Sequence, residues 1–371
     1  MDIKEKIKSY AHQLGIPLVR ITTADPFPEL LRLLEERKRL NYLSGWEPKN
    51  FELSCAPSAV LPGARSVICT AVPYLNTALP AQVAKGRGLI SKFSLGIDYH
   101  RVLKDKLFKL LVYLKEIRPE TEGVICVDNG PAFDRALAYR SGLGFYGKNN
   151  VLITREFGSF VFLGEIITNL ELEPDFPLDL NCGECTLCLD NCPSGALVEP
   201  YCLNASRCLS YLTQNKGDIP LELRGFLENK IYGCDLCQDV CPWNKKIVFN
   251  CEQDFSCFEH LRTPELTKIL QMNNQEFKEV FGKTAAGWKG RTTLQRNALV
   301  ALANMGEIDA VPIIKDKLND ERAVIRSYAI WALVKLLKKD ALSILTKHLK
   351  GEKNEKIKLE IEGIIGEIED N

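Results

Sequence analysis

Two cysteine runs between residues 182 and 242 constrain the fold of this chain more than any other feature of its sequence. The first run has the spacing C-x2-C-x2-C-x3-C-P, which is typical of loops that bind cubane iron–sulfur clusters. The second run ends in the same C-P pair but is one cysteine short, because Ile231 stands where its first cysteine is expected. Two cubanes need eight thiolates, and the two runs supply seven of them: Cys182, Cys185, Cys188, Cys192, Cys234, Cys237 and Cys241.

The eighth thiolate must come from Cys202 or Cys208, which lie between the two runs. The fourth cysteine of such a run usually binds the cluster of the other run. We therefore expect crossed ligation, in which one cluster is held by Cys182, Cys185, Cys188 and Cys241, and the other by Cys192, Cys234, Cys237 and the intermediate cysteine. Structural zinc is an alternative, but zinc prefers four thiolates in two separated pairs, and eight clustered cysteines exceed that number.

Length and charge limit the remaining possibilities. With 371 residues, the chain is long enough for two or three domains. Its 48 basic and 48 acidic side chains balance, so any nucleic-acid binding must come from a local basic patch. The N-terminal helix is charged and lacks the apolar stretch of a signal peptide, and no run of about 18 apolar residues could span a membrane. These features predict a cytoplasmic protein with metal-bound thiolates.

Strands alternate with helices in residues 1–175, which predicts an α/β or α+β domain. The strand candidates are PLVRITTA, RSVICTAVPYL, GVICVD and two strands within VLITREFGSFVFLGEIITNLEL. The helix candidates are residues 1–16, a helix that follows Pro28, Arg101–Ile117, and PAFDRALAYRSGLG, in which Pro131 is expected at the helix N-terminus.

The rest of the chain differs in character. The region around the cysteine runs shows little periodicity and is expected to fold around its metals, with a helix near residues 221–229 as a spacer. The C-terminal part is a repeat: with an offset of 31 residues, Asn297–Leu318 overlays Tyr328–Leu349, and a partial third copy continues to Ile364. Two amphipathic helices per unit predict a short HEAT-like solenoid, whose curved flank suits a large partner.

Asp134 is the candidate for proton chemistry. It lies early in a predicted helix, where a carboxylate often only complements the helix dipole. However, the loop after that helix, residues 142–150, is polar and rich in glycine, and such a loop lets backbone approach a large ligand closely. A carboxyl group that faces a closed ligand cavity can have a raised pKa and act as a proton donor.

Histidine offers no obvious metal ligand. His100, in GIDYH, is the only histidine near a candidate site loop. The cobalamin-binding pattern D-x-H-x-x-G is absent, because Arg101, Val102 and Leu103 follow His100. We therefore expect His100 to form hydrogen bonds or packing contacts and not to bind a metal.

A basic segment precedes the helical repeat. Residues 280–306 contain four basic residues and no acidic one, and Trp288 lies among them. The segment is either an ordinary solvated helix cap or a footprint for a phosphate backbone.

Taken together, the motifs resemble the epoxyqueuosine reductase family, which completes queuosine in tRNA. The resemblance covers nearly the whole chain and rests on FSLGIDYH, DNGPAFDRALAYRSGLGFYGKN, CGECTLCLDNCPSGAL, SRCLSYLT, YGCDLCQDVCPWN and GWKGRTTLQRNALVALAN. It implies that Cys208, within SRCLSYLT, is the eighth cluster ligand.

The fold that the resemblance implies is α+β with three domains. Residues 1–175 would form a nitroreductase-like catalytic domain that holds cobalamin base-off, as in reductive dehalogenases, with no protein histidine on the cobalt. Residues 176–260 would form a ferredoxin-like domain with two [4Fe-4S] clusters. Residues 261–371 would form HEAT-like repeats that bind tRNA.

The resemblance also implies site residues and partners. Asp134 would be the proton donor, and cobalamin would contact Ile97, Asp98, Tyr99, Asp134, Lys148, Asn149, Gly158 and Ser159. The anticodon stem-loop of tRNA would be held by Arg140, Lys283, Lys289, Arg291, Arg296 and Asn297. Electrons would come from a small external donor such as a flavodoxin or a ferredoxin and pass through the clusters to cobalamin, in a monomeric enzyme.

Two alternatives account for fewer of these features. A dehalogenase-like cobalamin reductase of a small molecule would need neither the helical repeats nor the basic segment. A non-catalytic electron-transfer protein would leave residues 1–175 without a role.

Overall fold

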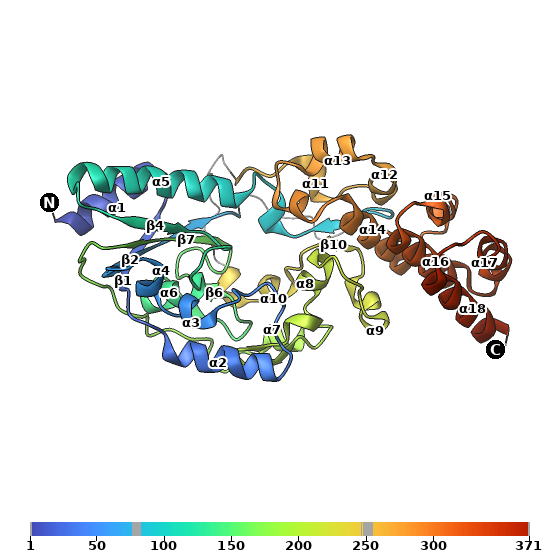
Figure 1. The fold of residues 1–371 in the computed structure, drawn as a ribbon, viewed down its shortest axis with the longest axis horizontal. Helices are drawn as coiled ribbons and strands as arrows, with labels where there is room; N and C mark the ends of the chain where they lie inside the picture. Colours follow the sequence, from blue (N-terminus) through green and yellow to red (C-terminus); the bar gives the residue numbers. More distant parts are fainter. Residues whose placement is uncertain (1, 76–82, 246, 248–254, 370–371) are drawn as a thin grey trace. The chain divides into compact units, whose positions relative to one another are not determined.

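The computed structural model describes residues 2–75, 83–245, 247 and 255–369, which form two compact units (Figure 1). The first unit takes its residues from 1–78, 96–208 and 235–257, and the second from 79–95, 209–234 and 258–371. The expected boundaries near residues 175 and 260 remain predictions. Among the described helices, none combines the length and the apolar character needed to cross a bilayer.

A four-stranded antiparallel sheet forms the core of the first unit. Its order is β1 (Leu18–Thr23), β2 (Ser66–Pro73), β7 (Val161–Thr168) and β4 (Gly123–Cys126). All eight residues of β2 are buried, which matches the apolar run read as a strand from the sequence. Each of these strands was among the sequence predictions.

Helices cover both faces of this sheet. On one face lies α5 (Tyr99–Ile117), which packs against β7 and β4 and in turn contacts α1 (Ile3–Gln13) (Figure 1). On the other face α6 (Asp134–Arg140) packs against β7 and β2. Gly164 of β7 faces α5, since a Cβ there would lie 2.9 Å from Leu107. Because side chains alternate along a strand, the next residue, Glu165, points toward α6.

The start of α6 differs from the prediction. The helix begins at Asp134, three residues after Pro131. The preceding loop is turned back on the sheet: Asp128 has a φ of 50°, and the Asn129 N–H donates to the Val127 carbonyl. The Asp134 carboxylate accepts a hydrogen bond from the Asp128 backbone N–H, which fixes the first turn of the helix at this point.

Short elements complete the first unit. They are α2 (Pro28–Arg39), α3 (Phe51–Ser54), α4 (Pro57–Val60), β5 (Phe145–Tyr146), β6 (Leu152–Ile153), α7 (Leu187–Asp190), β8 (Leu197–Glu199), β9 (Cys202–Leu203) and α10 (Leu236–Asp239).

The second unit is mainly helical. Two short strands, β3 (Leu89–Ile90) and β10 (Lys230–Tyr232), pair in parallel. The spacer helix expected over residues 221–229 is shorter than predicted, since α9 spans only Leu221–Arg224. A 3-10 turn follows it, and Glu228, with a φ of 51°, ends the helical conformation. The other helices are α8 (Leu209–Gln214), α11 (Glu259–Arg262), α12 (Leu266–Gln271), α13 (Asn274–Phe281), α14 (Arg291–Met305), α15 (Val311–Asp316), α16 (Ala323–Leu337), α17 (Leu342–Leu349) and α18 (Glu355–Glu369).

The C-terminal helices confirm the predicted repeat. The pair α14 and α15 corresponds to the pair α16 and α17, and α18 begins the third copy (Figure 1). The long helix α14 is buried from Thr293 to Ala303, because α12 and α16 pack against it within the second unit. A repeat buries its apolar face only against its neighbours, so α14 depends on both contacts.

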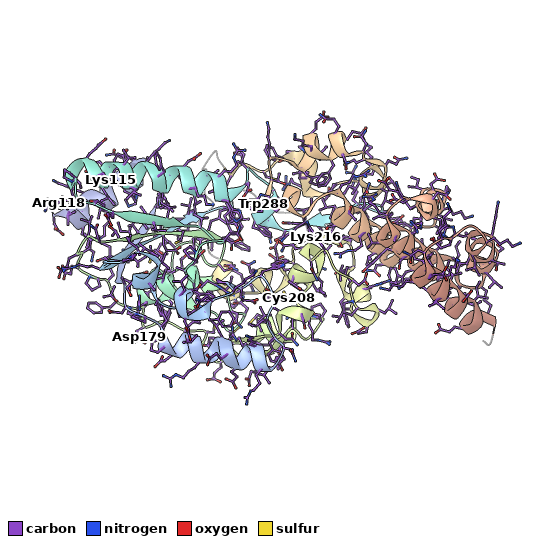
Figure 2. The ribbon with its side chains drawn as sticks, in the orientation of Figure 1. Lys115, Arg118, Asp179, Cys208, Lys216 and Trp288 are labelled. Atoms are coloured by element: carbon purple, nitrogen blue, oxygen red, sulfur yellow. The ribbon has the colours of Figure 1, made fainter. Side chains whose placement is uncertain are left out.

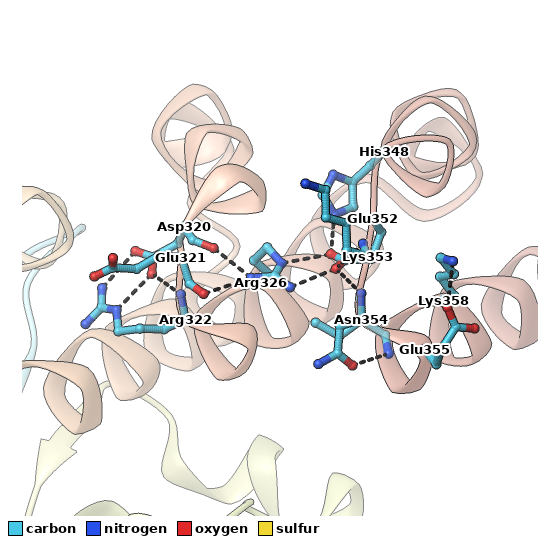
Figure 3. Close-up of polar contacts among 11 residues, drawn as sticks. Asp320, Glu321, Arg322, Arg326, His348, Glu352, Lys353, Asn354, Glu355 and Lys358 are labelled. Carbon is cyan, nitrogen blue, oxygen red and sulfur yellow. Dashed lines mark hydrogen bonds and ion pairs between the residues drawn. The ribbon is translucent and has the colours of Figure 1, made fainter.

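Glu352 joins α16 to the connection between α17 and α18 (Figure 3). Its carboxylate accepts two hydrogen bonds from the Arg326 guanidinium, at 2.7 and 2.8 Å, and two more from the backbone N–H groups of Lys353 and Asn354. The hydrogen bonds from Arg326 lower the pKa of Glu352 to about 2, with further lowering from the backbone N–H groups.

We expect Glu352→Gln to lower the free energy of unfolding of the second unit by about 2–4 kcal/mol, because Arg326 loses a paired, mostly buried partner. Urea unfolding followed by helix circular dichroism measures this loss. Since the folded-state pKa of Glu352 is depressed, its contribution is complete above about pH 4.5 and is lost as pH falls toward 2. Glu355→Gln, on an exposed residue of α18, is the control and should be nearly neutral.

Candidate functional site

Asp134 lies at the first position of α6 and belongs to a network of acidic groups in the first unit. Its Oδ2 accepts a hydrogen bond of 2.7 Å from the Asp128 N–H. Its Oδ1 is screened from solvent and receives no N–H or alcohol donor from the described residues. Loss of hydration raises the pKa of Asp134, the charge of Asp128 raises it further, and the result is about 7. A carboxyl group with this pKa holds a proton in a large fraction of molecules at neutral pH.

Asp128 is kept ionised by its neighbours. Burial alone would raise its pKa, but hydrogen bonds with His100 and Tyr99 lower it below the ordinary value. The negative charge of Asp128 is therefore available to hold the nearby Asp134 in its protonated form. Nothing in the spacing of the sequence pointed to Asp128.

His100 is confirmed as a hydrogen-bonding residue. Its Nδ1 lies 2.8 Å from Asp98 Oδ1, and its Nε2 lies 3.2 Å from Asp128 Oδ2. Burial would lower the pKa of His100, but the hydrogen bonds to Asp128 and Asp98 outweigh it and raise the pKa to about 9. Both ring nitrogens are therefore engaged by carboxylates within the protein.

The predicted cofactor contacts fall into two groups within the first unit. Ile97, Asp98 and Tyr99 lie at the start of α5, and Tyr99 hydrogen-bonds to Asp128, which in turn bonds to Asp134. The other four lie against the cysteine loops: Lys148 donates to the Gly183 carbonyl, Asn149 to the Cys237 carbonyl, Ser159 to Gln238, and Gly158 approaches Asn244 so closely that a Cβ would lie 2.0 Å from its Oδ1.

Aromatic side chains connect these two groups. The ring of Tyr99 stacks on Phe162 with centroids 4.2 Å apart, and Phe162 stacks on Tyr74 at 4.3 Å. Tyr74 hydrogen-bonds to Gln238, which also bonds to Ser159. The acidic network around Asp134 and the cysteine loops are thus parts of one packed region.

Four predicted cluster ligands surround one cavity. Cys182, Cys185 and Cys188 of the first run and Cys241 of the second line a space of about 110 Å³. Lys148, Asn149, Ile153, Leu187, Pro242 and Trp243 complete its walls. The same four thiols form the first set expected from crossed ligation.

The four thiols are spread around the walls of this cavity. Tetrahedral zinc needs its thiolates about 2.3 Å from one centre. Thiols spread around a cavity suit a larger group such as a cubane.

The second expected set, Cys192, Cys208, Cys234 and Cys237, stays a prediction. Cys208, labelled in Figure 2, directly follows the 3-10 turn Ala205–Arg207 in the sequence. Cys202, the other candidate for the eighth ligand, lies in the short strand β9.

The predicted tRNA contacts differ in their accessibility. In the second unit, Lys283 is exposed and Lys289 and Arg291 are half-buried, close in sequence to the exposed Trp288 (Figure 2). Arg296 and Asn297 are buried in α14. Arg296 donates to the carbonyls of Leu212 and Gly217, and Asn297 donates to those of Thr213 and Ile231.

Arg140 is also engaged within the protein. In the first unit its guanidinium donates to Thr22 Oγ1 and to the carbonyls of Thr23 and Asp25, and it lies over the ring of Phe27. Arg140, like Arg296 and Asn297, therefore holds backbone segments together, a role that its position in the sequence did not predict.

Comparison with known proteins supports the expected organisation. Residues 181–244 match the family described as 4Fe-4S double cluster binding domain, residues 55–129 match Epoxyqueuosine reductase QueG, DUF1730, and residues 289–364 match HEAT repeats. The double-cluster region and the helical repeats expected from the sequence are confirmed.

Similar proteins extend over nearly the whole chain. Epoxyqueuosine reductase of Bacillus subtilis (strain 168) is 41% identical over 365 residues, which cover 97% of this chain and 95% of that protein. A crystal structure of epoxyqueuosine reductase with an epoxyqueuosine-modified tRNA-Tyr stem loop has a TM-score of 0.94 at 40% identity and covers 99% of both chains.

A structure of the Bacillus subtilis enzyme with its Asp134 catalytic loop swung out of the active site has a TM-score of 0.93 at 40% identity and covers 98% of both chains. The similarity in sequence and structure spans both units with no large part left over. This chain therefore belongs to the epoxyqueuosine reductase family of oxidoreductases.

Proposed function

We propose that this chain reduces epoxyqueuosine to queuosine at the wobble position of tRNA, with Asp134 as the proton donor. The observation that carries this most strongly is the placement of Asp134: its Oδ2 accepts the Asp128 N–H, and its Oδ1 is screened from solvent without an N–H or alcohol donor from the described residues. Burial and the negative charge of Asp128 raise the pKa of this carboxyl, so it can carry a proton. The related enzymes add support, since one is solved with an epoxyqueuosine-modified stem loop and another has an Asp134 catalytic loop. This chain has the same residue type at the same number.

The residues around Asp134 fit a bound cobalamin. The buried Asn150 Nδ2 has no hydrogen-bond acceptor among the described residues, so an acceptor atom of a bound ligand could pair with it. Both nitrogens of His100 are occupied, which agrees with a cobalt that has no histidine ligand. We propose that Ile97, Asp98, Tyr99, Lys148, Asn149, Gly158 and Ser159 hold the cofactor.

The cofactors supply the electron chemistry. When bound, the clusters would deliver single electrons and cobalamin would supply the cobalt chemistry that opens the epoxide. We propose that Cys182, Cys185, Cys188 and Cys241, which line one cavity, hold one cluster. We propose from the sequence that Cys192, Cys208, Cys234 and Cys237 hold the other. A small flavodoxin or ferredoxin as donor, a cytoplasmic location and a monomeric state remain predictions.

Asp134 then does the acid chemistry. Conversion of the epoxide to the alkene and water takes two electrons, which the bound cofactors would supply, and two protons. The protonated carboxyl of Asp134 gives the first proton to the oxygen of the epoxide, and a second proton from solvent lets that oxygen leave as water. The carboxylate that remains is stabilised by the Asp128 N–H and by the charge of Arg135. Conversion of tRNA that carries epoxyqueuosine, followed by nucleoside mass spectrometry, tests this function. Queuosine is the expected product, and unchanged epoxyqueuosine with a fully loaded, reduced enzyme would contradict the proposal.

We expect the double substitution Lys283→Ala and Lys289→Ala to weaken binding of the tRNA stem-loop. Each lost phosphate contact should reduce the slope of log affinity against log salt by about 0.7–0.9. The matched control is Lys115→Ala with Arg118→Ala, which removes two exposed charges from the first unit (Figure 2). Gel shifts over a salt series measure both. Equal loss in the two variants would mean that only the total charge of the protein matters and that these lysines make no specific contact.

A further inference from the structure

Glu165 is a buried acid at the centre of the sheet in the first unit. It lies in β7 and is fully buried, with Cys69 of β2 opposite it on one side and Cys126 of β4 on the other. The layer between this face of the sheet and α6 is otherwise apolar and contains Val67, Ala71, Leu137, Ala138 and Ile167. An acidic residue in such a layer needs a partner or a proton.

The partner of Glu165 is Asp134. The two carboxyl groups lie close enough to interact, and Asp134 Oδ1 and both oxygens of Glu165 are buried without a hydrogen-bond donor among the described residues. Two ionised carboxylates only accept hydrogen bonds, so this contact requires a proton on one of them. The pair therefore holds at least one proton in the folded protein.

The surroundings decide which carboxyl keeps that proton. Asp134 has the Asp128 N–H and the charge of Arg135 to stabilise its ionised form. Glu165 has neither, and burial together with the negative charge of Asp134 raises the pKa of Glu165 well above its ordinary value. When one proton remains, it therefore stays on Glu165.

The other groups that face Glu165 do not change this assignment. Burial raises the pKa of the thiols of Cys69 and Cys126, and these thiols remain neutral. Arg140 at the end of α6 and Ser141 just after it lower the pKa of Cys69, but burial outweighs both. The charge of Lys104, on α5 at the other face of the sheet, lowers the pKa of Cys126. Asp128, the remaining charged neighbour, is negative and disfavours a second carboxylate.

We propose that Glu165 is a positioning residue whose protonated carboxyl donates a hydrogen bond to Asp134 Oδ1 throughout the reaction. This inference rests on the proposed role of Asp134 as the proton donor. Glu165 keeps its own proton: the O–H bond of Asp134 breaks, its proton moves to the leaving oxygen, and the new carboxylate accepts hydrogen bonds from Glu165 and from the Asp128 N–H. Glu165 thus fixes the acid before the step and stabilises its anion afterwards.

Two substitutions of similar size separate this role from the alternatives. In Glu165→Gln the amide can still donate to Asp134 Oδ1, so kcat should stay within about threefold of wild type. In Glu165→Met the donor is lost while the volume is kept, so kcat should fall about 10- to 100-fold, as expected for a hydrogen bond to a charged group. The falling limb of the pH profile should also move to higher pH in Glu165→Met, because the Asp134 anion is less stabilised.

Other outcomes would overturn the proposal. Equal losses in the two variants would indicate that Glu165 acts through its charge or passes on its proton. Wild-type kcat and an unshifted pH profile in Glu165→Met would leave Glu165 with a packing role only. Melting temperatures of both variants check that the fold is retained.

Infrared spectroscopy provides a test that does not depend on turnover. At a pH well above 7, the wild-type protein as purified should show the carbonyl stretch of one buried protonated carboxyl. The band should be absent in Glu165→Gln and present in Asp134→Asn. If wild type lacks the band, Glu165 is ionised and this inference is wrong, whatever Asp134 does. If the band behaves as expected but Asp134→Asn turns over normally, the proton-donor assignment fails instead.

Discussion

Asp134→Asn should lower the rate of epoxyqueuosine reduction by about 10²- to 10⁴-fold, the range that a positioned general acid contributes. Asparagine has nearly the same shape and can still receive the Asp128 N–H, but it has no acidic proton to give. The cluster cavity does not include Asp134, and asparagine keeps the size of Asp134 and the acceptor for the Asp128 N–H, so both cofactors should still bind. Single-turnover conversion of modified tRNA, followed by nucleoside analysis, measures the effect.

The pH dependence of the wild-type rate also tests whether Asp134 is the proton donor. Because the pKa of Asp134 is raised to about 7 and the reaction needs its protonated form, the rate should be constant at lower pH and fall as pH rises through about 7. Asp179→Asn, at an exposed position of the first unit, is the matched control and should behave as wild type (Figure 2). Near-wild-type turnover in Asp134→Asn would remove Asp134 from the proton-donor role.

Cys241→Ala should have the second large effect, the loss of one cluster. Cys241 is the only one of the four thiols around the described cavity that comes from the second cysteine run. Crossed ligation therefore predicts that this change empties the cavity formed mainly by the first run. Iron should fall from about eight to about four atoms per chain, and reduction of modified tRNA should stop because electrons no longer reach the site.

Substitutions of Cys202 and Cys208 test which of the two is the eighth cluster ligand. Cys202→Ala should keep both clusters, whereas Cys208→Ala should lose the second one. Iron and sulfide content, with EPR of the reduced protein, distinguishes these outcomes. Full iron content in Cys241→Ala would show that the cavity thiols do not form one ligand set. Cluster loss in Cys202→Ala would return that cysteine to the second set.

Much of the architecture could be predicted because it rests on local patterns. The strands of the sheet appear as short apolar runs, and the helical repeat appears as an offset of 31 residues. Cysteine spacing reflects the geometry of a cubane, so it predicted which thiols would surround one cavity. These signals depend on residues close in sequence or on a strict period.

The rest depends on contacts between distant parts of the chain. The single acidic residue in the apolar strand VFLGEIIT was visible, but its contact with Asp134 depends on the packing of α6 on β7. The start of α6 moved from Pro131 to Asp134 because the preceding loop turns back on the sheet. Arg296 and Asn297 looked like surface groups in a basic segment, yet α14 directs them to backbone carbonyls from α8, its following loop and β10.

We propose that the first unit holds cobalamin beside Asp134, with no histidine ligand on the cobalt. EPR of the protein purified without oxygen and supplied with cobalamin tests it most directly. We expect the signal of base-off cob(II)alamin with no nitrogen ligand on the cobalt, because both nitrogens of His100 are bound by carboxylates. Intact clusters without any cobalamin binding, or a cobalt with a histidine ligand, would contradict the account.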